Sequence, residues 1–320
     1  MKKYLMRLDF MAARHWFSAV SAVLVVASIA LIIARGLNLG LDFTGGTIIE
    51  VHNPGGDIVI DDVRNALEGT PYSEATLQHF GSASDLVVRV QPLHKLIEDG
   101  EVADDRGIEA DKVGLEVTAL LQDEIPALEQ RRVEFVGPAV GDELRDKSGT
   151  AMLAALIVIL IYIGIRFTSK LGVSAVAALF HDVIIVLGAF ALMDWQVDLT
   201  VLAAMLALIG YSINDSIVIA DYVRDSFRNS RVSDPHAVVN DAIRKTLGRT
   251  INTALTTWLV VWALQIFGGP AVHGFALAMS IGVIVGTYSS IYIVCNLALS
   301  LKMNKEDFML PEAKEVDDMP

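Results

Sequence analysis

Long uncharged apolar stretches alternate with polar segments along the 320-residue chain. A helix needs about 20 mostly apolar residues to cross roughly 30 Å of hydrocarbon. Six stretches reach or approach that length: 16–34, 149–165, 172–193, 199–222, 251–267 and 274–301. The first follows a basic leader, as the core of a signal peptide does. It is too long for such a core, however, and no small-x-small cleavage site follows it. The pattern therefore predicts six retained membrane-spanning helices.

The polar segment between the first and second stretches has the pattern of a folded domain. Apolar–polar alternation indicates four strands, at 47–52, 75–80, 85–91 and 132–136. Helical spacing indicates two helices, at 60–67 and 108–128. The order strand–helix–strand–strand–helix–strand fits a ferredoxin-like sandwich. The predicted fold class is an α-helical membrane protein: a six-span bundle with one α+β domain between spans 1 and 2.

Composition supports a membrane protein and excludes other classes of function. The chain is 53% hydrophobic and 20% charged, and its mean hydropathy is +0.49. A typical soluble domain has about a quarter of its residues charged. These values exclude a soluble cytoplasmic enzyme and a disordered chain. A net charge of −13 argues against a nucleic-acid partner. The one cysteine, Cys295, excludes a disulfide framework and a cysteine-based metal cluster.

The positions of Lys and Arg predict the orientation in the membrane. Basic residues gather in the leader, in a short link at 166–170 and in a longer link, whereas the opposite links carry almost none. By the positive-inside rule, both termini are cytoplasmic and the domain is extracytoplasmic. The predicted segments are a leader at 1–15, span 1 at 16–35, the domain at 36–147, spans 2–6 at 148–301 with a basic cytoplasmic link at 223–250, and a tail at 302–320.

Ionisable residues inside a bilayer are rare, and they are functional candidates by default. His181 and Asp182 lie in the middle of span 3, and Asp215 lies in span 4. Ser212 and Asn214 lie beside Asp215 and form a small polar stripe with Ser216. The alternative for the uncharged residues is hydrogen bonding between helices. Such bonding requires no titrating group, so Asp215 is the predicted proton carrier.

Arg249 stands at the cytoplasmic mouth of span 5 and is the predicted partner of Asp215. The alternative role is an ordinary positive-inside anchor. His181 and Asp182 are a second candidate relay, since histidine titrates near neutral pH. Their alternative role is structural. Neighbouring helical residues point about 100° apart, which predicts that these two cannot face one partner.

Two glycine pairs have geometric roles. Gly45 and Gly46 lie where the chain leaves span 1 for the first strand, so we expect a tight turn there. Gly282 and Gly286 form a small-xxx-small pair in span 6, which allows another helix to approach closely.

Three segments together resemble the SecF members of the SecD/SecF family of protein-export membrane proteins, within the RND superfamily. They are Gly40-Leu41-Asp42-Phe43-Thr44-Gly45-Gly46-Thr47, Phe135-Val136-Gly137-Pro138-Ala139-Val140-Gly141 and Gly210-Tyr211-Ser212-Ile213-Asn214-Asp215-Ser216-Ile217-Val218. The resemblance runs from Gly40 to about Leu301. One position departs: the family usually reads Asp-Arg-x-Arg-Glu at the end of span 4, and here Tyr222 replaces the first arginine.

The resemblance implies a function for the chain. It would be a proton-motive-force-coupled accessory subunit, not an enzyme, in the bacterial cytoplasmic (inner) membrane. SecD would supply a required second six-span half, and SecYEG, YajC and the translocating preprotein would be neighbours. Asp215 and Arg249 would carry protons, and Gly45-Gly46 would form a hinge. The expected coupling ion is H⁺, with no other cofactor and no metal.

Two other functions stay open. Asp182 and Asp215 on neighbouring spans could form the carboxylate dyad of an intramembrane aspartyl protease. Neither aspartate has a Gly-x-Gly-Asp context, however, and the absence of His-Glu-x-x-His excludes a metalloprotease of that class. A passive scaffold is the second alternative, and it predicts that Asp215 can be replaced without loss of function.

Overall fold

The computed structural model describes residues 9–80, 82–90, 106–229, 232 and 234–309. The parts of the predicted leader and tail at 1–8 and 310–320 lie outside the described residues. The chain divides into two compact units. The membrane unit comprises Met1–Asn38, Met152–Trp195 and Thr200–Pro320, and the domain unit comprises Leu39–Ala151 with the short loop Gln196–Leu199.

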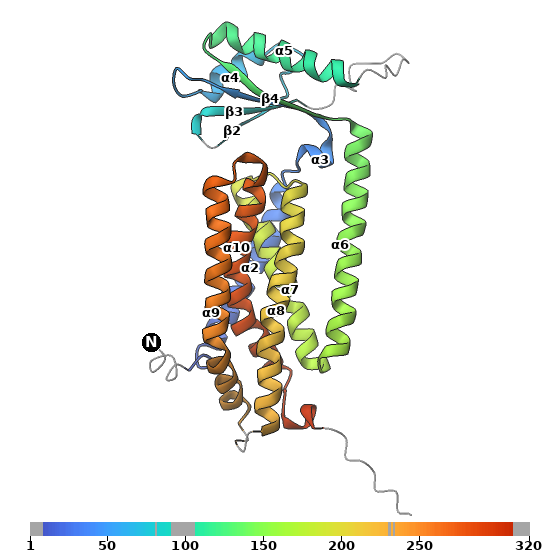
Figure 1. Cartoon of the computed structure of the whole chain (residues 1–320), viewed down its shortest axis with the longest axis vertical. Coiled ribbons are helices and arrows are strands. Elements are labelled where there is room, and N and C mark those ends of the chain that lie inside the picture. Colours follow the sequence, from blue (N-terminus) through green and yellow to red (C-terminus); the bar gives the residue numbers. More distant parts are fainter. Residues whose placement is uncertain (1–8, 81, 91–105, 230–231, 233, 310–320) are drawn as a thin grey trace, which may run out of the picture. The chain divides into compact units, whose positions relative to one another are not determined.

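Among the described residues, six helices are long and apolar enough to cross a membrane, as the hydropathy pattern predicts (Figure 1). They are α2 (Arg14–Arg35), α6 (Pro138–Arg166), α7 (Ser169–Met193), α8 (Leu199–Asn229), α9 (Pro235–Phe267), and a last one built from α10 (His273–Ser289), a π-helical turn η3 (Ser290–Val294) and α11 (Cys295–Ser300). The prediction of six spans is confirmed.

Helices α8 and α9 extend well beyond their apolar stretches. Residues 223–229 continue α8 and residues 235–250 begin α9, so helix occupies most of the segment expected as a link. The start of α9 is fixed locally, because the Asp234 carboxylate accepts a hydrogen bond from His236 N (3.1 Å) and Pro235 occupies the first turn.

In the membrane unit, α7, α8 and the α10–α11 helix form the interior. In the most apolar 18-residue stretch of each helix, half of α8 is buried, whereas only 6% of α6 is buried. Small residues allow close packing: a Cβ at Gly188 of α7 would overlap Ser28 of α2. The poorly buried helices α2, α6 and α9 therefore present most of their apolar surface outward.

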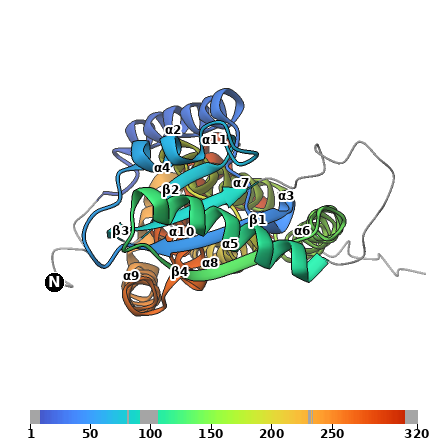
Figure 2. The ribbon, with the colours of Figure 1, turned by 90° about the horizontal axis from the view of Figure 1, so that it is seen from above.

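The domain unit has the predicted strand–helix order. Its elements are α3 (Leu41–Thr44), β1 (Gly46–His52), α4 (Ile60–Leu67), β2 (Thr76–Phe80), β3 (Ser82–Val90), α5 (Arg106–Glu124) and β4 (Glu129–Val136). The sheet is antiparallel with the order β2-β3-β1-β4. Figure 2 shows α4 and α5 lying over the sheet. Their apolar faces and the sheet enclose one core that includes Ile49, Val88 and Leu121. The ferredoxin-like prediction is confirmed.

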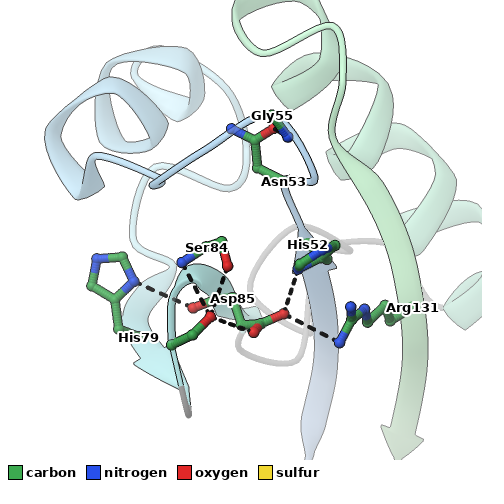
Figure 3. A network of polar contacts seen from close by, with 8 residues as sticks. His52, Asn53, Gly55, His79, Ser84, Asp85 and Arg131 are labelled. Atoms are coloured by element: carbon green, nitrogen blue, oxygen red, sulfur yellow. Dashed lines mark hydrogen bonds and ion pairs between the residues drawn. The ribbon is translucent and has the colours of Figure 1, made fainter.

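A polar network joins three strands at one end of this sheet (Figure 3). The Asp85 carboxylate of β3 accepts hydrogen bonds from Ser82 Oγ (2.6 Å) and His52 Nδ1 (2.7 Å), and it lies 3.3 Å from Arg131 of β4. The Ser82 hydrogen bond, together with His52 and Arg131, lowers the pKa of Asp85 from its usual value. The network therefore stabilises the strand pairing only while Asp85 is ionised.

Candidate functional site

Asp215 lies partly buried in α8, as its place in an apolar stretch predicts. Thr250 Oγ1 of α9 donates a hydrogen bond to Asp215 Oδ1 at 2.8 Å. The Ser290 hydroxyl, at the start of the π-helical turn, lies near this carboxylate and donates its hydrogen bond to the Gly286 carbonyl (2.6 Å). Oδ2 of Asp215 is buried without a hydrogen-bond partner. Three helices thus meet at one carboxylate that has a free acceptor oxygen.

Arg249 does not form the ion pair with Asp215 that the sequence suggested. The Arg249 side chain is exposed, and its charge acts on Asp215 only through space. The reason is rotation: consecutive helical residues point about 100° apart, so α9 can present Thr250 or Arg249 to Asp215, and it presents Thr250. Thr250 was not among the candidate residues that the sequence singled out.

A second carboxylate is more deeply buried. Asp182 of α7 is 1% exposed. Its Oδ2 accepts hydrogen bonds from Ser212 Oγ of α8 (2.6 Å) and Ser289 Oγ of α10 (2.9 Å), and His181 Nδ1 lies 2.9 Å from Oδ1. Asp182 therefore connects three helices at one point.

His181 and Asp182 contact different residues of α10, in agreement with the rotation between neighbouring helical residues. Asp182 contacts Ser289 of α10, while the His181 ring stacks on Tyr288 of the same helix, with ring centroids 6.2 Å apart. The two also hydrogen-bond each other. Because α10 offers two consecutive residues that are themselves rotated apart, both members of the pair find partners on it. Nε2 of His181 is buried without a partner.

Glycine in α10 allows these groups to meet. A Cβ at Gly286 would lie 3.3 Å from Ser212 Cβ and 3.5 Å from Asp182 Oδ2, and a Cβ at Gly282 would lie 2.6 Å from Leu208 Cδ1 of α8. The Gly286 carbonyl accepts a hydrogen bond from the Ser290 hydroxyl (2.6 Å) and lies 3.1 Å from the Ser289 hydroxyl, where it competes with Asp182 for the one Ser289 proton. The helix then becomes a π-helical turn, a feature frequent at functional sites.

The other residues of the polar stripe on α8 point in different directions. Ser212 faces Asp182, and Asn214 is exposed. Ser216 is 1% exposed, and its hydroxyl has no hydrogen-bond partner. The stripe is therefore divided between the buried cluster and the outer surface of the helix.

The glycine-rich segment before β1 forms a turn and also holds the start of α8. Gly45 and Gly46 have φ values of +66° and +120°, which favour glycine. Within the domain unit, Gly40 N donates to Val197 O (2.7 Å), and the Asp42 carboxylate accepts a hydrogen bond from Leu199 N (2.9 Å). Asp42 thus caps the N-terminus of α8 from a distant part of the chain. Asp42 belongs to one of the family-like segments of the sequence, but its position there indicates no role.

An ionic cluster lies toward the other end of α8. Asp221 pairs with Arg166 of α6 and with Arg224, the latter at 3.2 Å. Tyr222, which stands where the family usually has arginine, is 44% exposed. In this chain Arg166 and Arg224 already supply the positive charge beside Asp221.

The geometry does not match a protease dyad. Asp182 and Asp215 make no direct hydrogen bond to each other; each carboxylate is bound by hydroxyls instead. Two carboxylates that share a proton would have to lie in direct contact. Across the described residues, no three His, Cys, Asp or Glu side chains gather as a metal site requires.

Comparisons with known proteins agree with this architecture. Residues 116–304 match the family model "Protein export membrane protein SecD/SecF, C-terminal", and residues 30–52 match "SecD/SecF GG Motif". The chain is 43% identical to protein translocase subunit SecF of Vibrio alginolyticus, over 94% of this chain and 93% of that protein. It is 40% identical to the subunit of the same name from Escherichia coli O157:H7, over 98% and 94% of the two chains.

A solved structure is similar over nearly the whole chain. The crystal structure of SecDF from Thermus thermophilus, described as a translocon-associated membrane protein, matches 92% of this chain with a TM-score of 0.79 and 34% identity. This chain spans 39% of that longer protein. None of these descriptions supports a protease.

Proposed function

Because the chain belongs to the SecD/SecF family of protein-export membrane proteins, we propose that it is a subunit of the Sec machinery that uses proton entry at Asp215 to promote preprotein export. It acts with SecD as an accessory translocase subunit, not as an enzyme. One observation supports the proton step above all: Asp215 is a partly buried carboxylate inside a membrane helix, and one of its oxygens has no partner.

Protonation changes how Asp215 interacts with its surroundings. An aspartate in the bilayer centre costs about 2.5–3.5 kcal/mol on insertion scales, so the anion is favoured only by groups that stabilise it. Thr250 donates to that anion, and the Arg249 charge attracts it. A proton arriving at Oδ2 removes the charge and weakens both interactions. The packing of α8 against α9 therefore has two preferred states, which differ in the proton that they hold.

The membrane potential is large enough to drive such a switch. One charge moving through 100 mV is worth about 2.3 kcal/mol, which shifts a two-state equilibrium about fiftyfold. In the proposed cycle, the change between the two helix states moves the domain. The moving domain helps to draw the emerging preprotein outward. Helix α8 connects Asp215 directly to the loop Gln196–Leu199, which belongs to the domain unit.

The outer surface of α9 supports a second six-span half. Arg249, Asn252, Thr253 and Thr256 are exposed on a helix that must cross the membrane. Thr253 and Thr256 bond to carbonyls of their own helix, but lipid offers Arg249 and Asn252 no hydrogen-bond partner. We assign this polar face to contact with SecD. Transporters of this kind are commonly built from two repeats with the ion site between them.

The proposed location is the bacterial cytoplasmic membrane, with both termini in the cytoplasm and residues 36–147 outside. SecYEG, YajC and the preprotein are the proposed neighbours. The basic residues near 166–170 and 223–250 support this orientation. A reporter that is active only outside the cytoplasm should be active when fused at Gly69 and silent at Asp234. Activity at Asp234 would contradict the orientation.

The decisive variant is Asp215→Asn. Asparagine keeps the volume and can still accept the Thr250 hydrogen bond, but it cannot take up a proton. We expect secretion to lose its dependence on the proton-motive force, while the amount of protein in the membrane stays unchanged. Asp225→Asn is the matched control, because Asp225 lies on the same helix and its side chain is 64% exposed. Normal secretion by Asp215→Asn at normal abundance would support the passive scaffold instead.

A further inference from the structure

A short hydrogen bond ties α8 to α7 close to the proton site. Ser212 Oγ of α8 donates to Asp182 Oδ2 of α7 at 2.6 Å, and both side chains are almost completely buried. One turn further out, Tyr211 Oη and Thr287 Oγ1 of α10 lie 3.3 Å apart. Lipid offers no replacement partner for a polar group that loses its hydrogen bond. The bond between Ser212 and Asp182 therefore favours one rotation of α8.

The backbone of α10 leaves α8 little room to turn at this level. A Cβ at Gly286 would lie 3.3 Å from Ser212 Cβ and 3.5 Å from Asp182 Oδ2, so the backbone of α10 approaches both side chains. Ser289 Oγ, one turn along α10, also lies 2.9 Å from Asp182 Oδ2. Closely packed interiors transmit displacements rather than absorb them. A change in the Asp182 contacts should therefore move α8 as a body.

The same turn of α8 carries Ser212 and Asp215. The two residues are three positions apart, which is about 60° around the helix axis and about 4.5 Å along it. Side-chain atoms lie about 5–6 Å from the axis, so a rotation of about 30° would move the Asp215 carboxylate by about 3 Å. Thr250 Oγ1 of α9 lies 2.8 Å from Asp215 Oδ1. That hydrogen bond would not survive such a displacement.

Building on the proton step proposed at Asp215, we propose that Asp182 is a positioning residue for that step. By accepting the Ser212 hydrogen bond, it fixes the rotation of α8 that places Asp215 against Thr250. Asp182 makes no hydrogen bond to Asp215, and it acts only through α8. This role requires an acceptor oxygen at position 182 and no change in its protonation.

The choice of substitution separates positioning from proton holding. Asp182→Asn keeps nearly the same volume and an acceptor oxygen for Ser212, and its NH₂ group can donate to Nδ1 of a neutral His181. Asp182→Leu fills the site but leaves the Ser212 hydroxyl without its acceptor. A positioning role predicts that asparagine serves and leucine fails. A proton-holding role predicts that both fail.

The test follows Asp215 itself in the full-length chain with SecD in proteoliposomes. A hydrophobic carbodiimide labels protonated carboxyl groups inside a membrane, and mass spectrometry of the peptide that contains Asp215 measures the label at each pH. We expect Asp182→Leu and Ser212→Ala to shift the pH midpoint of labelling by about one unit, because loss of a hydrogen bond to a charged group changes an equilibrium about tenfold or more. The shift should have the same direction as in Thr250→Val. Asp182→Asn should keep the midpoint of the unchanged protein.

Ser174→Ala is the matched control for Ser212→Ala. Ser174 is also completely buried, and its hydroxyl donates to a carbonyl of its own helix at 2.7 Å. Its replacement should leave the midpoint unchanged. Tyr211 of α8 and Arg249 of α9, which interact electrostatically with Asp215, are kept in every one of these variants. A loss of overall stability would lower the abundance of the protein without moving the midpoint.

The outcomes separate this inference from the proposed function. An unchanged midpoint in Ser212→Ala and Asp182→Leu would overturn the positioning role. A midpoint shifted as far in Asp182→Asn as in Asp182→Leu would also overturn it, because the charge and not the acceptor would then matter. If Asp182→Leu does not accumulate in the membrane, Ser212→Ala decides, since it leaves Asp182 in place. Full proton flux in Asp215→Asn would overturn the proton step, whatever the labelling shows.

Discussion

Replacing Asp42 tests whether a side chain from the glycine-rich segment holds the start of α8. Its carboxylate accepts a hydrogen bond from Leu199 N at 2.9 Å. Leu199 is the first residue of α8 and one of the residues whose N–H has no partner within the helix. Asp42→Ala removes this cap and a negative charge at the positive end of the helix dipole, while the backbone bond from Gly40 to Val197 remains.

The expected cost follows from these two contributions. Loss of an N-cap costs about 0.5–2 kcal/mol, and loss of a favourable charge at a helix N-terminus costs about 0.3–1 kcal/mol. Together they lower the free energy of local opening by roughly 1–3 kcal/mol, or about 5–150-fold in the population of the opened state. Asp42→Asn should show only the smaller contribution, because asparagine caps helices about as well as aspartate.

Hydrogen exchange measured by mass spectrometry on the intact protein gives the readout. A peptide that covers residues 196–204 should exchange faster in Asp42→Ala by a factor in this range, with Asp42→Asn in between. The matched control is Asp61→Ala, which removes a carboxylate from an ion pair whose two side chains are 80% and 65% exposed. Unchanged exchange of residues 196–204 in Asp42→Ala would refute the capping role.

Two further predictions concern the proton site and the domain. Thr250→Val should reduce proton-coupled export severalfold, whereas Thr250→Ser should keep it, because serine retains the hydroxyl that donates to Asp215 Oδ1. Equal export by both variants would show that this hydroxyl is dispensable. The pKa of Asp85 is lowered in the folded domain, so its contribution to stability is present above the unfolded-state pKa of about 3.9 and is lost as the pH falls through the folded-state value. Calorimetry should therefore find the domain of Asp85→Asn about 1 kcal/mol less stable at pH 7, with a difference that fades near pH 2; an equal difference at both pH values would be inconsistent with an ionised Asp85.

Hydropathy and alternation predicted the spans and the domain well, because both patterns are local. The apolar length of each span can be recognised from neighbouring residues alone. The same is true of the apolar–polar alternation that predicts strands β1 and β4. Asp215 and Asp182 could be found in the same way, since an acidic residue is conspicuous in an apolar stretch. The ends of α8 and α9 were harder, because charged residues continue a helix as well as apolar ones do.

The contacts of the site depend on helix rotation and on residues far apart in sequence, which a pattern does not contain. Arg249 was expected at Asp215, and its neighbour Thr250 is there instead. Ser212 and Ser289 are ordinary small residues in the sequence, and only the fold brings their hydroxyls to the Asp182 carboxylate. Asp42 reaches α8 across more than 150 residues of sequence.

In the proposed mechanism, Asp215 takes up a proton and this uptake drives the subunit. The most direct measurement is proton entry into proteoliposomes that contain the full-length chain with SecD, under an imposed membrane potential. It compares the unchanged protein with Asp215→Asn at equal abundance. We expect proton flux in the unchanged protein, whereas the flux of Asp215→Asn should fall to the level of empty vesicles. Equal flux in both would contradict it.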